Sequence, residues 1–261
     1  MLYRGWVDAC AERGVRLVGY SRPGYGTSDR KEGRTVSDCV SDVEAVAGEL
    51  GFDRFFVLGH SGGGQHALAC AALLPERVLA AATVGAPAPH YAPGLDWLAG
   101  QDEENVEEWQ AALVGGETLR NLLDDWAAEM LDDSEEPASS DDAEADAFDS
   151  MVSDADRASI TPETKAFAAE RRKHTLSGGI WGWFDDDIAE TKRWGFDVGE
   201  IQVPVTVWHG AQDRFVPPAH GEWLATAIPG ALAQFRTDEG HFSMVDSKFD
   251  ELVDDLLANS R

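Results

Sequence analysis

A serine flanked by glycines stands between an apolar segment and a run of helix-forming residues, in the sequence Gly59-His60-Ser61-Gly62-Gly63. A nucleophile on a tight turn between a strand and a helix adopts a strained backbone, which exposes its hydroxyl at the carboxyl end of the sheet. Glycines two positions before and after the serine leave room for the neighbouring backbone, so we expect Gly59 and Gly63 to be sterically required. On its own, the motif is weak evidence for a nucleophile, because a chain rich in Gly and Ser can contain it by chance. The alternative interpretation is a structural turn without a chemical role. Its position between a strand and a helix makes it specific.

A serine hydroxyl needs a general base, and the base needs an acid that orients it. Two candidates lie downstream, each just after an expected strand. Asp213 follows the strand Val203–Trp208, and His241 follows the strand Ala231–Arg236. Because the carboxyl ends of parallel strands share one edge of a sheet, we expect Ser61, Asp213 and His241 to meet there.

Other residues compete for these two roles. Asp96, which follows another expected strand, is an alternative acid. We expect Asp238 and Glu239 to face solvent. Six further histidines lack the arrangement of a glycine and a histidine after a late strand: His60, His66, His90, His174, His209 and His220. His60 is adjacent to Ser61 and should point away from it, and His209 should pack beneath the loop that carries Asp213.

Short β-branched or aromatic segments alternate with segments of helical spacing, which is typical of an α/β fold with a mostly parallel sheet flanked by helices. The expected strands are Val15–Tyr20, Arg54–Leu58, Val78–Val84, Val203–Trp208 and Ala231–Arg236. The expected helices are Tyr3–Arg13, Val36–Leu50, Gly63–Leu74, Ala219–Ile228 and Ser247–Ala258.

The region 89–195 interrupts this alternation, since it contains no convincing strand. We interpret it as a helical, acidic, Trp-rich cap inserted in an α/β core formed by 1–88 and 196–261. It contains six of the nine tryptophans: Trp97, Trp109, Trp126, Trp181, Trp183 and Trp194. These suggest either an apolar or aromatic substrate pocket or an ordinary hydrophobic core. The polar segment Ser134–Asp142 predicts a mobile surface loop.

The chain resembles the α/β-hydrolase superfamily, specifically the capped hydrolases that include proline iminopeptidases and esterases. The matching phrases are Tyr20–Ser28 (YSRPGYGTS), Gly59–Gly63, Trp208–Asp213 (WHGAQD) and Gly240–Ser243 (GHFS). The resemblance implies that Ser61 is the nucleophile, Asp213 the acid and His241 the base, and that Gly62 N–H is an oxyanion donor. Serine in place of a carboxylate excludes the chemistry of haloalkane dehalogenases and epoxide hydrolases.

We therefore expect a serine hydrolase that cleaves a small ester, amide or related acyl substrate through an acyl-enzyme on Ser61. Water completes the reaction, although peroxide or an alcohol could equally accept the acyl group. The mechanism needs no cofactor and no metal. The alternative is a non-catalytic or degenerate protein of the same fold that uses its pocket as a receptor.

The sequence departs from the family at its start. Family members carry strands and a His-Gly loop ahead of the helix that corresponds to Tyr3–Arg13, and that loop supplies the second oxyanion donor. The resemblance places the absent strand between Val15–Tyr20 and Arg54–Leu58, where its loss would leave a trench. Losing one oxyanion donor typically lowers the rate by about a hundred- to a thousandfold. We favour a natural start farther upstream; the alternatives are remaining strands that close the gap, or an inactive protein.

Composition limits the possible partners and the compartment. The net charge of −27 argues against nucleic acids and anionic membranes as partners. It indicates either an ordinary acidic protein or adaptation to high salt. The three cysteines, Cys10, Cys39 and Cys70, lack metal-ligand spacing, and we expect buried free thiols. Without a signal peptide or a long apolar segment, a cytoplasmic protein is expected. The sequence does not indicate the oligomeric state.

Overall fold

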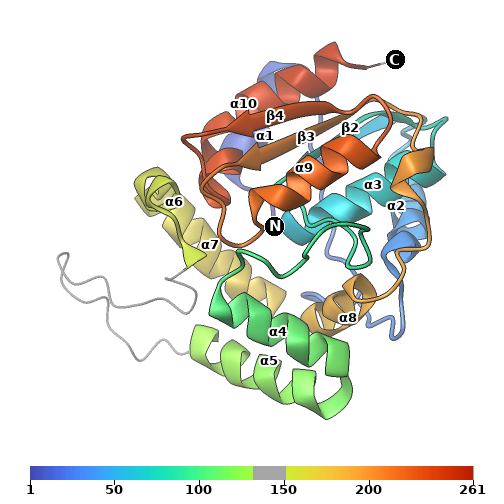
Figure 1. Ribbon diagram of the computed structural model, residues 1–261. Helices are drawn as coiled ribbons and strands as arrows, with labels where there is room; N and C mark the ends of the chain where they lie inside the picture. The colour runs from blue at the N-terminus through green and yellow to red at the C-terminus, as the bar shows by residue number, and fades with distance from the viewer. Residues whose placement is uncertain (132–150, 261) are drawn as a thin grey trace.

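The computed structural model describes residues 1–131 and 151–260 (Figure 1). The surface loop predicted over Ser134–Asp142 lies outside the described residues. The chain forms an α/β fold in which a parallel sheet is flanked by helices. This confirms the fold class expected from the alternating pattern.

The sheet has four parallel strands in the order β1-β2-β3-β4. Their bounds are β1 Phe55–His60, β2 Val78–Val84, β3 Val205–Gly210 and β4 Leu232–Arg236. Four of the five expected strands are therefore confirmed, with shifts of at most two residues at their starts and ends. Parallel strands that are covered on both faces are apolar throughout, which is why β2 and β3 were recognisable from sequence.

Helices cover both faces of the sheet (Figure 1). On one face, α1 (Arg4–Glu12) and α10 (Phe242–Ala258) pack with alternate residues of β2 and with Trp208. On the other face, α3 (Gly64–Leu73) and α9 (Pro218–Ala227) lie on the sheet, and α2 (Cys39–Glu49) packs on α3. The 3-10 turn η1 (Val36–Asp38) precedes α2, and the turn η4 (Val198–Glu200) precedes β3. Helix α10 begins five residues earlier than the sequence predicted.

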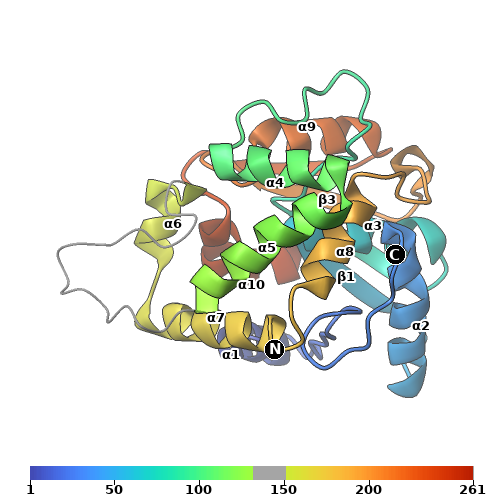
Figure 2. The ribbon, with the colours of Figure 1, turned by 90° about the horizontal axis from the view of Figure 1, so that it is seen from below.

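Five further helices fall within the range 89–195, and its described part contains no strand (Figure 2). They are α4 (Glu103–Val114), α5 (Gly116–Leu131), α6 (Asp154–Ser159), α7 (Pro162–Thr175) and α8 (Trp181–Glu190). Helices α4, α5 and α8 share a small hydrophobic core built around Leu119 and Leu123. The domain boundaries at 88 and 196 stay a prediction.

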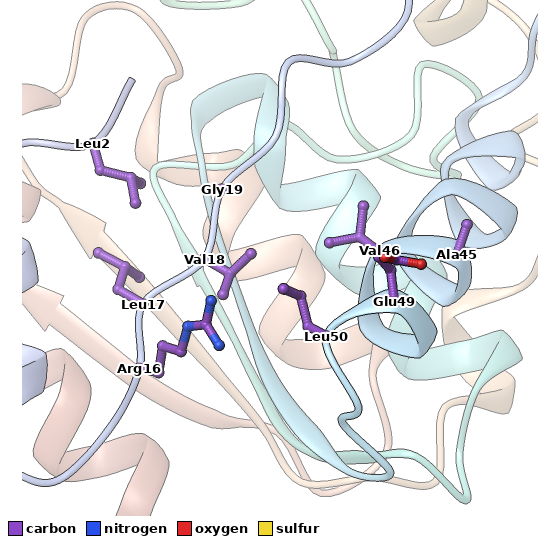
Figure 3. Close-up of a pocket in the computed structure, with 9 residues that line it drawn as sticks. All are labelled: Leu2, Arg16, Leu17, Val18, Gly19, Ala45, Val46, Glu49 and Leu50. Carbon is purple, nitrogen blue, oxygen red and sulfur yellow. The ribbon is translucent and has the colours of Figure 1, made fainter.

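The segment Val15–Tyr20 is extended but is not a strand, so that prediction was wrong. A groove of about 700 Å³ separates Arg16–Gly19 from α2 and is lined by Val46 of that helix and by Leu50, which directly follows it (Figure 3). A strand exists only where a neighbour accepts and donates its backbone hydrogen bonds. Here the nearest strand, β1, pairs only with β2 in the described sheet.

Two predictions from composition can be compared with the structure. Cys10, Cys39 and Cys70 are all buried free thiols, as expected. Among the helices of the described ranges, none combines the length and the apolar character needed to cross a bilayer.

Candidate active site

Ser61 begins the 3-10 turn η2 (Ser61–Gly63), which joins β1 to α3. Its φ of 52° makes it the only non-glycine residue with positive φ in the described chain. Such a conformation costs about 1–3 kcal/mol and is held only where the surroundings demand it. A Cβ on Gly59 would collide with the carbonyl of Gly63, so Gly59 is sterically required. The same expectation for Gly63 was wrong, because a Cβ there would meet no atom within 4 Å; the second close approach is at Gly64.

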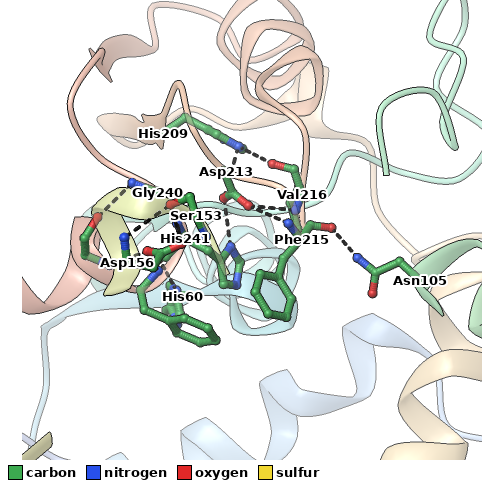
Figure 4. Close-up of polar contacts among 12 residues, drawn as sticks. His60, Asn105, Ser153, Asp156, His209, Asp213, Phe215, Val216, Gly240 and His241 are labelled. Carbon is green, nitrogen blue, oxygen red and sulfur yellow. Dashed lines mark hydrogen bonds and ion pairs between the residues drawn. The ribbon is translucent and has the colours of Figure 1, made fainter. Parts of the chain in front are cut away.

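Asp213 and His241 form a buried hydrogen-bonded pair (Figure 4). Asp213 Oδ2 lies 2.8 Å from His241 Nδ1, and the two residues are 4% and 2% exposed. The other carboxylate oxygen of Asp213 accepts the backbone N–H groups of Phe215 at 3.0 Å and Val216 at 2.8 Å. These bonds hold the carboxylate so that it fixes the tautomer of His241, with Nε2 left free to accept a proton.

Gly85, directly after β2, provides the space in which this pair meets. A Cβ at this position would lie 2.9 Å from Asp213 Oδ2 and 3.1 Å from His241 Nδ1, and its φ is 54°. Any side chain there would separate the acid from the base. Sequence reasoning missed Gly85; the available signal was a glycine at the carboxyl end of a buried strand.

Ser61 stands at the same edge of the sheet as the pair, but no hydrogen bond joins it to His241 among the contacts of the described residues. The ring of His60, the residue before Ser61, packs against the ring of His241, with the two ring centroids 4.6 Å apart. His60 Nε2 lies 3.0 Å from the backbone oxygen of His241, and burial lowers the pKa of His60 well below its usual value. A neutral His60 therefore donates to the backbone carbonyl of His241.

The other histidines differ in their partners. His209 is fully buried, and its Nε2 lies 2.8 Å from the carbonyl of Val216 and 3.5 Å from Asp213 Oδ2, as expected for a residue beneath the loop that carries Asp213. His220 Nε2 lies 3.0 Å from the carbonyl of Trp97, and burial lowers the pKa of His220 to about 4. His66 contacts the carbonyl of Val36, and His174 contacts the hydroxyl of Ser21.

The rival acid Asp96 is exposed. Glu239, expected to face solvent, is 6% exposed and accepts a hydrogen bond from Ser247 Oγ at 2.7 Å.

Asp156 of α6 is a further residue that sequence reasoning missed. It is fully buried, and its Oδ1 accepts the N–H groups of Phe242 at 2.7 Å and Ser243 at 2.8 Å. Its Oδ2 accepts His241 N at 3.2 Å. A carboxylate at a helix N-terminus satisfies donors that have no partner within the helix. Asp156 thus fixes the start of α10 and with it the backbone of His241 (Figure 4). The sequence signal was the capping box that begins at Ser153.

A pocket of about 260 Å³ opens onto Ser61. Its lining includes Ser61 and Gly62 from the turn, the rings of Trp97, Trp109 and Trp183, and several acidic side chains. Both interpretations of the tryptophans hold in part. Three of them line this pocket, whereas Trp194 belongs to the hydrophobic core.

The acidic side of the pocket carries more carboxyl groups than cations. Asp185 and Asp186 of α8 are paired with arginines: Arg30 and Arg34 for Asp185, Arg22 and Arg34 for Asp186. Glu108, Asp187 and Glu190 take part in no ion pair of the described structure. Burial is the main cause that raises the pKa of Glu108 to about 7 and of Asp187 and Glu190 well above their usual values. Mutual repulsion of the carboxyls adds to the shifts at Asp187 and Glu190. The acidic run at 185–187 is thus buried.

The comparisons with known proteins agree with this architecture. A family model described as alpha/beta hydrolase fold matches residues 1–248. A 2-hydroxy-6-oxononadienedioate/2-hydroxy-6-oxononatrienedioate hydrolase from Cupriavidus pinatubonensis is 27% identical over 97% of this chain and 80% of its own. An enol-lactonase from Burkholderia xenovorans has a TM-score of 0.64 at 20% identity, covering 97% of this chain and 86% of its own. A bromoperoxidase from Bacillus anthracis has a TM-score of 0.66 at 18% identity, covering 98% of this chain and 87% of its own.

Proposed function

The chain belongs to the alpha/beta hydrolase fold family, and from this premise we propose that it is a serine hydrolase that cleaves a small ester, amide or related acyl compound through an acyl-enzyme on Ser61. One observation carries the proposal. The hydrogen bond of 2.8 Å between Asp213 and His241 lies at the sheet edge where Ser61 holds its strained φ of 52°. A turn with a purely structural role requires neither the hydrogen-bonded pair nor the strained backbone of Ser61.

The proposed reaction uses groups that face one pocket or adjoin it. Ser61 Oγ attacks the substrate carbonyl while His241 Nε2 takes the hydroxyl proton, and Asp213 stabilises the resulting imidazolium. The backbone N–H of Gly62 donates to the oxyanion. His241 then returns the proton to the leaving group, and a second cycle with water in place of Ser61 releases the acid. The hydrogen bond between Ser61 and His241 forms when substrate binds, since such bonds are often long or misaligned in empty sites.

The relatives support a hydrolase of small acyl compounds. The curated relatives are hydrolases of 2-hydroxy-6-oxononadienedioate, and the solved structures include a lactonase and esterases. The pocket of about 260 Å³ favours a substrate of few atoms. Aromatic rings on one side of it support an acyl group with an apolar portion.

A fluorophosphonate probe tests the reaction class. We expect covalent labelling at Ser61, identified by mass spectrometry of the labelled peptide, and its complete loss in Ser61→Ala. Asp213→Asn should lower the labelling rate by about four orders of magnitude, because the tautomer of His241 would no longer be enforced. Absence of labelling in a sample shown to be folded would favour the receptor alternative. A panel of esters, amides and lactones then identifies the bond that is cleaved.

A further inference from the structure

We propose that Glu108, Asp187 and Glu190 form a subsite for a positively charged nitrogen, so that the acyl compound cleaved at Ser61 carries an ammonium group. This inference rests on the proposed function, because it names the substrate class of the same site. It also separates this chain from its curated relatives, which are named for dicarboxylate substrates. In their ionised form these three side chains would repel a carboxylate and attract a cation.

The three carboxyl groups and the nucleophile line one small pocket. Glu190 lies closest to the nucleophilic turn, since its Oε1 is 3.2 Å from the position that a Cβ of Gly62 would occupy. Glu108 approaches from α4 and Asp187 from α8. In a volume of about 260 Å³ the charged group of a substrate can be only a few bonds from the carbonyl carbon. The expected substrate is therefore a short acyl chain with a nearby ammonium group.

Asp187 has one carboxyl oxygen without a partner. The residue is 4% exposed and its side chain hydrogen-bonds to the carboxyl group of Glu108, but its Oδ2 has no hydrogen-bond partner within the described part of the chain. A buried carboxyl oxygen without a partner is costly, and an N–H donor from a ligand would remove that cost. A metal ion is not the expected occupant: across the described ranges, no group of three or more His, Cys, Asp or Glu has a geometry that could hold one.

The aromatic part of the pocket favours the same class of ligand. Trp97, Trp109 and Trp183 line it together with the carboxyls, and Trp183 Nε1 donates to Glu108 Oε1 at 2.5 Å. Indole faces attract cations, and this attraction increases when water is excluded. The one arginine in the lining, Arg22, forms its ion pair with Asp186. Its charge also favours the ionised form of Glu190, but burial outweighs this effect and the pKa of Glu190 stays well above its usual value.

The protonation of the cluster predicts how binding depends on pH. The titratable and charged groups of this pocket are Glu108 of α4, Asp186, Asp187 and Glu190 of α8, Arg22 and Tyr25 of the loop before η1, and His220 of α9. Burial raises the pKa of Glu108 to about 7, so part of the cluster is protonated in the empty pocket near neutral pH. A cation favours the ionised carboxyls, so it should bind more tightly as the pH rises from 6 to 8 and should release protons on binding.

Binding can be tested without any activity. The probe is n-butylammonium chloride, measured by calorimetry at pH 8 against n-butanol as the neutral compound of similar shape. We expect Asp187→Asn and Glu190→Gln each to weaken the binding of butylammonium about tenfold, the loss of one charged contact. Glu107→Gln is the matched control, because Glu107 is exposed, precedes Glu108 on α4 and changes the net charge of −27 by the same amount. Equal weakening by all three variants, or equal binding of butanol, would overturn the proposal.

A matched pair of esters links the subsite to catalysis. The 4-nitrophenyl esters of 4-(trimethylammonio)butanoate and 5,5-dimethylhexanoate differ only in a cationic nitrogen replacing a carbon. The quaternary nitrogen has no N–H, so this pair tests the charge preference of the subsite, whereas butylammonium tests the charge together with the N–H contact. We expect kcat/KM to favour the cationic ester about tenfold, with the preference lost in Asp187→Asn and kept in Glu107→Gln. Hydrolysis of both esters at equal rates would overturn the cationic subsite and leave the hydrolase intact. Specific butylammonium binding without hydrolysis of either ester would keep the subsite and refute the hydrolase.

Discussion

Replacing Asp156 by alanine should damage both the stability of the fold and the base of the active site. The carboxylate accepts three backbone N–H groups around the start of α10, from Phe242, Ser243 and His241, at 2.7, 2.8 and 3.2 Å. It also accepts the N–H and the hydroxyl of Ser153 at 3.3 and 2.8 Å within its own capping box. An N-cap acceptor stabilises by about 1 kcal/mol, and a buried donor without a partner costs about 1–3 kcal/mol. Water entering the space left by the carboxylate would accept hydrogen bonds from some of the N–H groups that lose their partner. We therefore expect the free energy of unfolding to fall by about 3 kcal/mol.

The functional consequence follows from the position of His241 at the start of α10. Loosening its backbone moves the imidazole relative to Ser61, and a displacement of about 1 Å typically costs a hundredfold in rate. We expect kcat to fall by about this factor with KM little changed, because Asp156 does not line the pocket.

Urea denaturation and fluorophosphonate labelling of the folded fraction measure the two effects separately. Asp154→Ala is the matched control, since Asp154 is an exposed residue of the same helix α6. Equal stability of the two variants would refute the energetic argument. A destabilised Asp156→Ala variant that labels at the wild-type rate per folded molecule would show that the carboxylate stabilises α10 without positioning the base.

Three further predictions follow from the structure. Gly59→Ala should prevent folding, because its Cβ would collide with Gly63 O, whereas Gly63→Ala should fold normally; circular dichroism and soluble yield distinguish them. Folding raises the pKa of Glu108 from 4.5 to about 7, so this carboxyl opposes folding increasingly as the pH rises through that window. Glu108→Gln should thus add about 2 kcal/mol to the free energy of unfolding at pH 8 and little below pH 4.5, as measured by urea titration at each pH. If the net charge of −27 reflects adaptation to high salt, the melting temperature should rise between low and molar KCl; no rise would exclude that interpretation.

The parts of the fold that were predictable are those in which local pattern and packing agree. Strands β2 and β3 are mostly apolar because both faces are covered, and the predicted bounds of β2, Val78–Val84, are those observed. The segment Val15–Tyr20 has the same pattern of residues, but a strand depends on a pairing partner that composition cannot reveal. The start of α10 was also missed, because the helix is extended over residues 242–246 by the tertiary capping of Asp156.

The site divides in a similar way. The contact between Asp213 and His241 could be predicted, because topology alone brings loops after neighbouring strands to one edge. The sequence carries a local signal for Gly85 and for Asp156, a glycine after a buried strand and a capping box, but only the three-dimensional course of the chain reveals what each of them contacts. An acidic run such as 185–187 is ordinarily a solvated surface, so its burial against arginines and the pocket was not readable from sequence.

The contacts of the region 89–195 limit how a substrate can enter. Helix α6 is fastened to the start of α10 through Asp156, so moving this helix away from the sheet would release the backbone of His241. Helices α4, α5 and α8 instead pack on one another around Leu119 and Leu123. Two of these three helices, α4 and α8, contribute Glu108, Asp187 and Glu190 to the pocket wall. Helix α8 is fastened as well, because its Asp185 and Asp186 form ion pairs with Arg22, Arg30 and Arg34 of the segment before η1. The contacts of α6 and of α8 therefore both oppose a movement of the region 89–195 away from the sheet, since such a movement would break buried ion pairs or release the backbone of His241.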